Sequence, residues 1–184
     1  MQRPDPDGGL GGLFEDLEQQ AEALELAERA AEVADRARAE YRDVRLVERL
    51  QASVGRSVRL EVTGCGTVAG ELDRVGPDCV FVVEAGGIRH WVLALAHVVA
   101  VAGAAADAMA TEAWPVTARL GWGAALRRLA EDQVACVLVR TDGRAIPTRL
   151  LRVGADFVEH RPEADPGADP ALTPLAALAA VRTG

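Results

Sequence analysis

The spacing of apolar residues changes once along the chain, and the change separates a helical segment from a β-rich one. Residues 13–54 contain neither Gly nor Pro and consist mostly of strong helix formers. Near the N-terminus, leucines recur at helical spacing in two rows: Leu10, Leu17 and Leu24 in one, and Leu13 in the other. This pattern predicts a long helix over residues 13–54, bent near residues 39–41. A flexible N-terminus of residues 1–12, with two Pro and four Gly, is expected before it.

Two interpretations of this helix are open. Either the helix packs on its own domain, or it is a coil that self-associates or binds a partner through Leu10, Leu13, Leu17 and Leu24. A solitary helix of this length lacks enough protein of its own to cover an apolar face. The second interpretation is therefore favoured.

From Gly55 onward, apolar and polar residues alternate with the period of two that is typical of β-strands. Glycine-containing turns separate five such stretches. They predict strands at residues 58–63, 67–75, 79–84, 88–95 and 98–101. Short strands at this spacing indicate a small barrel over residues 55–103.

The same pattern returns after an Ala-rich connector at residues 104–118. A helix predicted at 120–130 precedes strands predicted at 134–140, 145–153, 157–160 and 172–181. The turn Arg74-Val75-Gly76-Pro77-Asp78 has its match in Arg152-Val153-Gly154-Ala155-Asp156. Such an internal repeat decides the architecture. The predicted fold class is α+β: a long N-terminal helix, then two small barrels over 55–103 and 119–184 that pack on each other.

The order of helix, strand, Gly turn and strand with Gly70 and Leu72, closed by Val-Leu-Ala-Leu and Val-Val-Ala-Val at 92–101, resembles the Sm-like (LSm) barrel of the SH3 type. The resemblance covers residues 44–103 well and 120–184 less closely. The whole chain also resembles a family of small, mostly uncharacterised actinobacterial proteins, some labelled Fis-type transcriptional regulators. They share a Glu/Ala-rich coil, an Arg-Val-Gly-x-Asp turn and a closing Pro-Leu-Ala-Ala-Leu-Ala-Ala-Val-Arg.

Sm-like proteins bind single-stranded RNA and assemble into rings by pairing strand edges. The resemblance supports the fold more strongly than it supports RNA binding, because residues of the Sm signature are missing. The Sm pattern has Asp six residues past the Gly of Gly-x-Leu, where this chain has Gly76, and then an Asn, which the chain lacks altogether. The Sm pattern also has Arg-Gly or Lys-Gly before its last strand, where this chain has Arg89-His90-Trp91. A Fis-like protein would end in a recognition helix, whereas residues 172–181 predict a strand.

Charge is distributed unevenly along the chain. The net charge is −8, and residues 1–54 alone carry 7 Arg against 13 acidic residues, so most of the acidity is N-terminal. A globally acidic protein is repelled by nucleic acid unless it presents a local basic patch. Residues 119–152 hold 7 Arg against 3 acidic residues and supply such candidates: Arg127, Arg128, Arg140, Arg144 and Arg149. The alternatives are a solvated strand face or a docking site for the acidic N-terminal arm.

No arrangement of residues points to catalysis or to a cofactor. The segment Gly64–Gly70 joins two strands, so it lacks the strand-to-helix setting of a dinucleotide site. The three Cys and three His show no zinc-ligand spacing. We expect no catalytic, cofactor-binding or metal-binding residue. The N-terminus has no signal-peptide pattern and the chain no membrane span, so a cytoplasmic location is expected.

Four residues are expected to have structural roles. Asp78 and Asp156 recur in equivalent turns, which predicts that each caps its own turn. His97 is expected to be a hydrogen-bonded core or interface residue. Trp122, between two glycines at the start of a helix, is expected to pack the two barrels together.

The favoured functional hypothesis is a non-enzymatic scaffold or regulatory interaction module, with the N-terminal coil used for self-association or for binding a protein partner. The alternative is an RNA- or DNA-binding regulator that uses the arginine-rich face of the second barrel. That alternative predicts that replacing Arg140 and Arg144 together by Ala weakens nucleic-acid binding, and that affinity falls steeply with salt.

Overall fold

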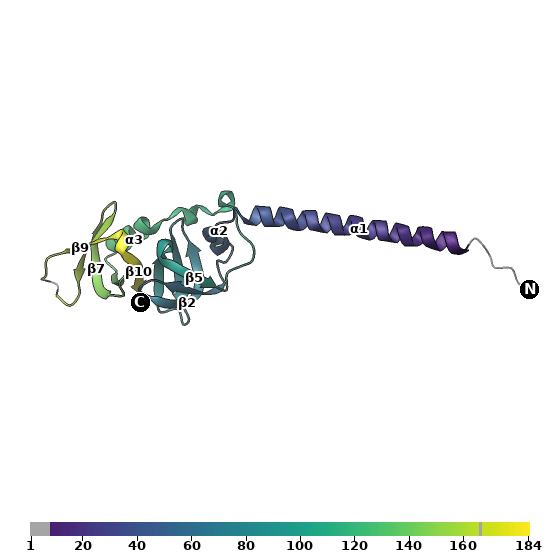
Figure 1. Cartoon of the computed structure of the whole chain (residues 1–184). Helices are drawn as coiled ribbons and strands as arrows, with labels where there is room; N and C mark the ends of the chain where they lie inside the picture. The colour runs from purple at the N-terminus through teal and green to yellow at the C-terminus, as the bar shows by residue number, and fades with distance from the viewer. Residues whose placement is uncertain (1–7, 166) are drawn as a thin grey trace, which may run out of the picture. The chain divides into compact units, whose positions relative to one another are not determined.

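The computed structural model of the chain describes residues 8–165 and 167–184, without the side chains of residues 8–18, 21, 34, 40 and 117 (Figure 1). The chain divides into two compact units, the first ending at Val44 and the second spanning Arg45–Gly184. Each unit is described by itself.

Helix α1 (Gly8–Tyr41) makes up most of the described part of the first unit. The predicted helix is confirmed, but it begins at Gly8, so it includes residues 8–12 of the segment that was expected to precede it. Residues 1–7 lie outside the described part of the chain. The helix ends at Tyr41 instead of bending there and continuing to residue 54.

A separate short helix, α2 (Leu46–Gln51), opens the second unit. Arg45 lies before it in an extended conformation, and its backbone N–H donates to Glu48 Oε2 at 2.9 Å. This contact satisfies a backbone donor at the helix start, as in a capping box. The start signal at residues 45–48 explains why one long helix is not formed.

Ten strands of the second unit form one antiparallel sheet that hydrogen bonds do not close into a barrel. The strands of the first half are β1 (Ser57–Val62), β2 (Gly66–Val75), β3 (Cys79–Glu84), β4 (His90–Ala94) and β5 (Val98–Ala102). Those of the second half are β6 (Ala135–Arg140), β7 (Ala145–Val153), β8 (Phe157–Pro162), β9 (Ala171–Pro174) and β10 (Leu178–Thr183). Their order is β5-β1-β2-β3-β4-β10-β6-β7-β8-β9. The α+β class is confirmed.

The internal repeat is visible in the order of the strands, since β5-β1-β2-β3-β4 is matched by β10-β6-β7-β8-β9. The repeated turns also match, because Gly76 N–H donates to the Cys79 carbonyl at 2.8 Å and Gly154 N–H to the Phe157 carbonyl at 2.9 Å. Each half has a short 3-10 helix before its last strand, η1 (Leu95–His97) and η4 (Leu175–Ala177). The connector holds two more, η2 (Thr111–Ala113) and η3 (Val116–Arg119).

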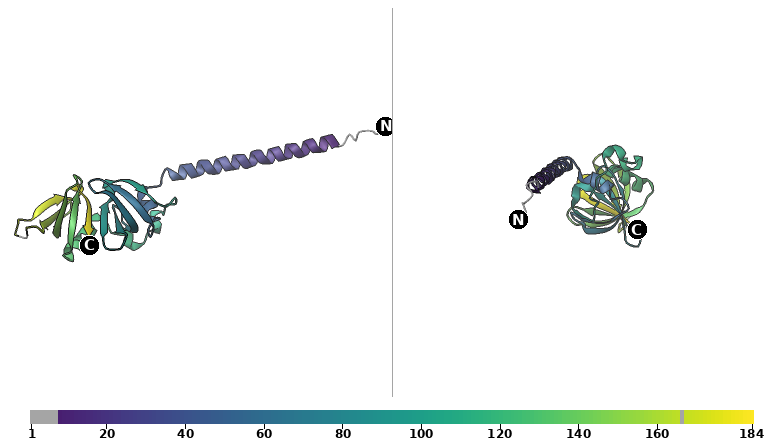
Figure 2. Two further views of the ribbon diagram at one scale, coloured as in Figure 1. Left: turned by 90° about the horizontal axis from the view of Figure 1, so that it is seen from below. Right: turned by 90° about the vertical axis from the view of Figure 1, so that its right-hand side faces the viewer.

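The two halves are joined by hydrogen bonds between β4 and β10, so the sheet runs through both of them (Figures 1 and 2). Helix α3 (Trp122–Glu131) carries Trp122, which is 6% exposed and lies in one buried cluster with Cys79 and Val92 of the first half and Leu138 of the second. This confirms the role expected for Trp122. His97 also bridges the halves, because its Nε2 donates to the Ala176 carbonyl at 3.1 Å.

Candidate functional site

The five arginines singled out from the sequence do not form one uncompensated patch. Arg127 and Arg128 lie on α3, Arg140 ends β6, Arg144 follows in the turn, and Arg149 lies on β7. Three of them face carboxylates: Arg128 Nε is 3.0 Å from Asp132 Oδ2, Arg140 Nη2 is 2.7 Å from Asp142 Oδ2, and Arg149 Nη2 is 3.7 Å from Glu163 Oε1. Arg127 and Arg128 line one groove, whereas Arg149 lines a different cavity.

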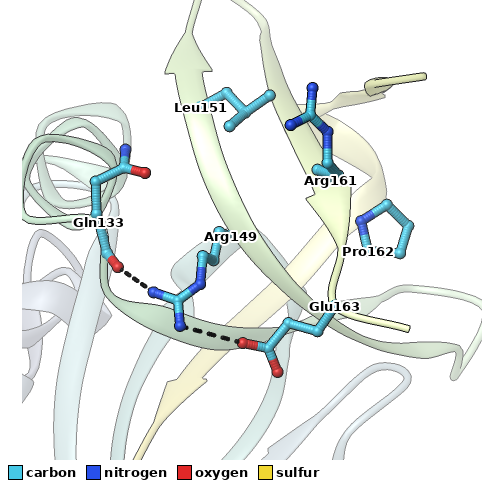
Figure 3. Close-up of a pocket in the computed structure, with 6 residues that line it drawn as sticks. All are labelled: Gln133, Arg149, Leu151, Arg161, Pro162 and Glu163. Atoms are coloured by element: carbon cyan, nitrogen blue, oxygen red, sulfur yellow. Dashed lines mark hydrogen bonds and ion pairs between the residues drawn. The ribbon is translucent and has the colours of Figure 1, made fainter. Parts of the chain in front are cut away.

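The cavity at Arg149 lies on the outer side of β7 and β8 and has a volume of about 510 Å³ (Figure 3). It is lined by Gln133, Arg149, Leu151, Arg161, Pro162 and Glu163. Arg149 and Arg161 are direct partners in the antiparallel register of β7 and β8. Directly opposed residues on one face have their Cβ atoms about 4.5–5.5 Å apart, so the two cations start from neighbouring positions.

Arg149 is fixed in place from two sides. Its Nη1 donates to the Gln133 carbonyl at 2.7 Å, and its Nη2 faces Glu163. Gln133 is the one non-glycine residue in the described chain with a left-handed backbone, at φ 50°. Its side-chain amide donates to the Ala130 carbonyl at 2.7 Å. Gln133 directly follows the C-cap Asp132 of α3, and a residue in this conformation commonly ends a helix, here with the Val134 N–H donating to the Leu129 carbonyl at 3.1 Å.

Arg161 has no counter-charge within the described part of the chain. Its Nε is buried without a hydrogen-bond partner, and Figure 3 shows Arg149 linked to both Gln133 and Glu163 while Arg161 has no such link. Sequence reasoning missed Arg161 because it lies outside the basic stretch 119–152. The signal was available, since Arg149 and Arg161 lie at equal distances from Ala155 in the turn that joins their strands.

The predicted coil contacts can be followed only in part. Leu24 is 60% exposed, whereas the side chains of Leu10, Leu13 and Leu17 lie outside the described residues. Leu26 and Val33 are also exposed, at 64% and 69%. Leu26 is two residues from Leu24 and therefore about 200° around the helix axis, so the described apolar side chains do not share one face.

The cysteines are poor nucleophiles. All three are free thiols, and burial raises the pKa of Cys65 and of Cys136 to about 11 and that of Cys79 to about 12. They are therefore protonated at neutral pH, and the thiolate is the reactive form. Over residues 8–165 and 167–184, no three His, Cys, Asp or Glu side chains gather as metal ligands would.

Compared with known proteins, the chain matches no family model and no curated protein. Among the described helices, none combines the length and the apolar character needed to cross a membrane.

Proposed function

We propose that the protein is a non-enzymatic scaffold or regulatory interaction module, which self-associates or binds a protein partner through α1. The observation that carries the proposal is a 34-residue helix in a unit of its own, with Leu24 of the predicted contact row 60% exposed.

Physical chemistry supports this interpretation of α1. Isolated helices draw little stability from propensity alone, and most helical stability in proteins comes from packing an apolar surface against other protein. Surface ion pairs such as Arg29–Glu25, at 2.8 Å between two exposed side chains, add only a few tenths of a kcal/mol. A second chain that covers the face of α1 containing Leu24 would supply the packing that the helix lacks.

We further propose that each half of the sheet is a degenerate Sm-like barrel of the SH3 type. The shared strand order, with the fifth strand beside the first and a 3-10 helix between the fourth and fifth, supports this assignment. Irregular register in β2–β3 and in β7–β8 gives both halves the local kink that a curved sheet needs. The chain has no Asn, and it has Gly76 where the Sm pattern has Asp. Both differences argue against inferring RNA binding from the fold.

Nucleic-acid binding by the second half is the alternative that we do not favour. The ion pairs at Arg128, Arg140 and Arg149 reduce the positive charge available to phosphates. A titration against single-stranded RNA, single-stranded DNA and duplex DNA at low and moderate salt separates the two functions. Binding at micromolar concentration with a clear salt slope would favour the alternative.

Two matched substitutions on α1 test the proposal. Leu24→Glu places a charge on the predicted contact row, and Leu26→Glu places the same charge about 200° away at a residue of similar exposure. We expect the association constant of the intact chain, measured by sedimentation, to fall at least tenfold for Leu24→Glu and to change less than twofold for Leu26→Glu. Equal effects, or no association in the parent protein or with an added partner, would contradict it.

A further inference from the structure

The same cavity occurs in both halves of the sheet, but its charge is reversed. In the first half, a cavity of about 510 Å³ is lined by residues that include Gly55, Glu71 and Val83. When the two repeated turns are aligned, these three take the positions of Gln133, Arg149 and Arg161. Glu71 also pairs with Val83 across β2 and β3 as Arg149 pairs with Arg161 across β7 and β8. The fold therefore forms the cavity without needing arginine at either position.

The second-half cavity is built at a cost. Like charges directly opposite each other on neighbouring strands are destabilising. Gln133 has a left-handed backbone as Gly55 has at the matching position of the first half, at φ 82°, and in Gln133 this conformation ends helix α3. One carboxylate, Glu163, faces Arg149 at 3.7 Å, while Arg161 lacks a counter-charge in the described chain. Two cations against one anion leave the cavity with an excess positive charge.

We propose that this cavity binds the oxyanion of a small ligand, a carboxylate or a phosphate, at the guanidinium of Arg161. Arg149, whose guanidinium is turned toward Gln133 and Glu163 in Figure 3, adds positive charge to the same cavity. Arginine presents planar N–H donors that match both groups, and such charge-assisted hydrogen bonds are the strong ones. The Nε–H of Arg161 is the donor left without an acceptor. Leu151 and Pro162 give the cavity an apolar wall beside the cations, which suits the carbon body of a small acid. The volume lies within the range of small-molecule sites.

The test is a titration of the intact protein with inorganic phosphate and, separately, with succinate, followed by calorimetry and by the NMR signal of the Arg161 Nε–H. We expect one saturable site and a shift of that signal. Arg161→Gln should weaken binding at least tenfold. The matched control is Arg152→Gln on the neighbouring strand β7, because Arg152 pairs with Glu159 at 2.7 Å and does not line the cavity. It should change the affinity less than twofold.

Saturable binding of either probe with this pattern supports the site, and the comparison of the two probes identifies which oxyanion it prefers. Arg149→Gln provides a second test, which decides the matter if circular dichroism shows that Arg161→Gln is misfolded. No saturable binding of either probe, or a parent-like affinity of the properly folded variants, would overturn the proposal. Neither result bears on self-association through α1, which the mass of the protein reports independently.

Discussion

At the scale of single residues, the second half carries a polar chain inside its core. His160 is 2% exposed and lies between two threonines, with Nδ1 3.0 Å from Thr148 Oγ1 and Nε2 3.0 Å from Thr173 Oγ1. Thr148 donates its one hydroxyl proton to the Arg161 carbonyl at 2.6 Å. Its oxygen must therefore accept from His160 Nδ1–H, and Nε2 accepts from Thr173. These contacts favour the neutral imidazole with its proton on Nδ1.

The buried histidine makes stability depend on pH. Burial lowers the pKa of His160 below its ordinary value of about 6.5, so the unfolded chain binds the proton more readily. The contribution of neutral His160 to the free energy of unfolding is therefore fully present above its ordinary pKa and is lost as the pH falls below that value. We expect a drop from pH 8 to pH 5.5 to lower the free energy of unfolding, measured with urea, more in the parent than in His160→Val.

The variant restores the residue of the first half, since Val82 takes the position of His160 when the two repeated turns are aligned. At pH 8 it should cost about 1–3 kcal/mol, because the buried Thr173 hydroxyl loses its partner. Carboxylates titrate in both proteins, so the difference between them isolates the histidine. An unchanged pH dependence in His160→Val would contradict the assignment.

Residues that matter through strand register are harder to find from the sequence, because a pairing between two strands must first be assumed. Arg161 was not singled out because it lies on the next strand along the chain from Arg149, and only the pairing of β7 with β8 brings them together. Gln133 gave no sign of its left-handed backbone, since glycine is the usual marker of that conformation. Trp122 was predictable, because a large aromatic residue between two glycines in a soluble chain needs burial.

At the scale of elements, Asp78 has a role different from the one predicted. Its carboxylate does not cap its own turn: Oδ1 accepts from the backbone N–H of Trp122 at 2.6 Å. Helix α3 has Gly121 at its N-cap, which provides no side-chain cap, so Asp78 satisfies a donor that the helix leaves free. Asp156 repeats the position in the second half, and within the described residues its carboxylate accepts no hydrogen bond. The two copies of the motif therefore place their Asp side chains in different surroundings, which the sequence alone does not show.

Replacing Asp78 should therefore matter more than replacing Asp156. We expect Asp78→Ala to lower the free energy of unfolding by about 1–2 kcal/mol, because α3 loses its cap and Trp122 its acceptor. Asp156→Ala should cost less than about 0.5 kcal/mol. Urea unfolding of both variants measures this difference, and equal losses would show that the carboxylate at position 78 does not hold α3.

Most elements were predictable because their signals are local. Alternation with period two and glycine turns marked the strands, and helix-forming composition marked α1. The break after Tyr41 was harder to place, because residues 42–45 contain neither Gly nor Pro and the start of α2 depends on the Arg45–Glu48 contact. The predicted strand 172–181 is two strands around η4, whose Leu-Ala-Ala sequence is compatible with either structure.

At the scale of the whole molecule, the repeat was visible in the Arg-Val-Gly-x-Asp turns, but the continuous sheet was not. β4 and β10 pair with each other although residues 95–177 lie between them in the sequence, through Leu93 with Ala180 and Trp91 with Arg182. Such long-range pairing leaves no pattern in either strand alone. It leaves β5 and β9 as the ends of the sheet, and edge strands offer unpaired backbone groups to other chains. These edges are the competing route to self-association.

The most direct test of self-association through α1 is the mass in solution of the intact chain and of a chain lacking residues 1–40, measured by light scattering over a range of concentrations. We predict that the intact chain exceeds its monomer mass of 19.4 kDa as concentration rises, and that the shortened chain stays monomeric. An intact chain that remains at 19.4 kDa would contradict self-association through α1. A shortened chain that still associates would assign the contact to the sheet edges instead.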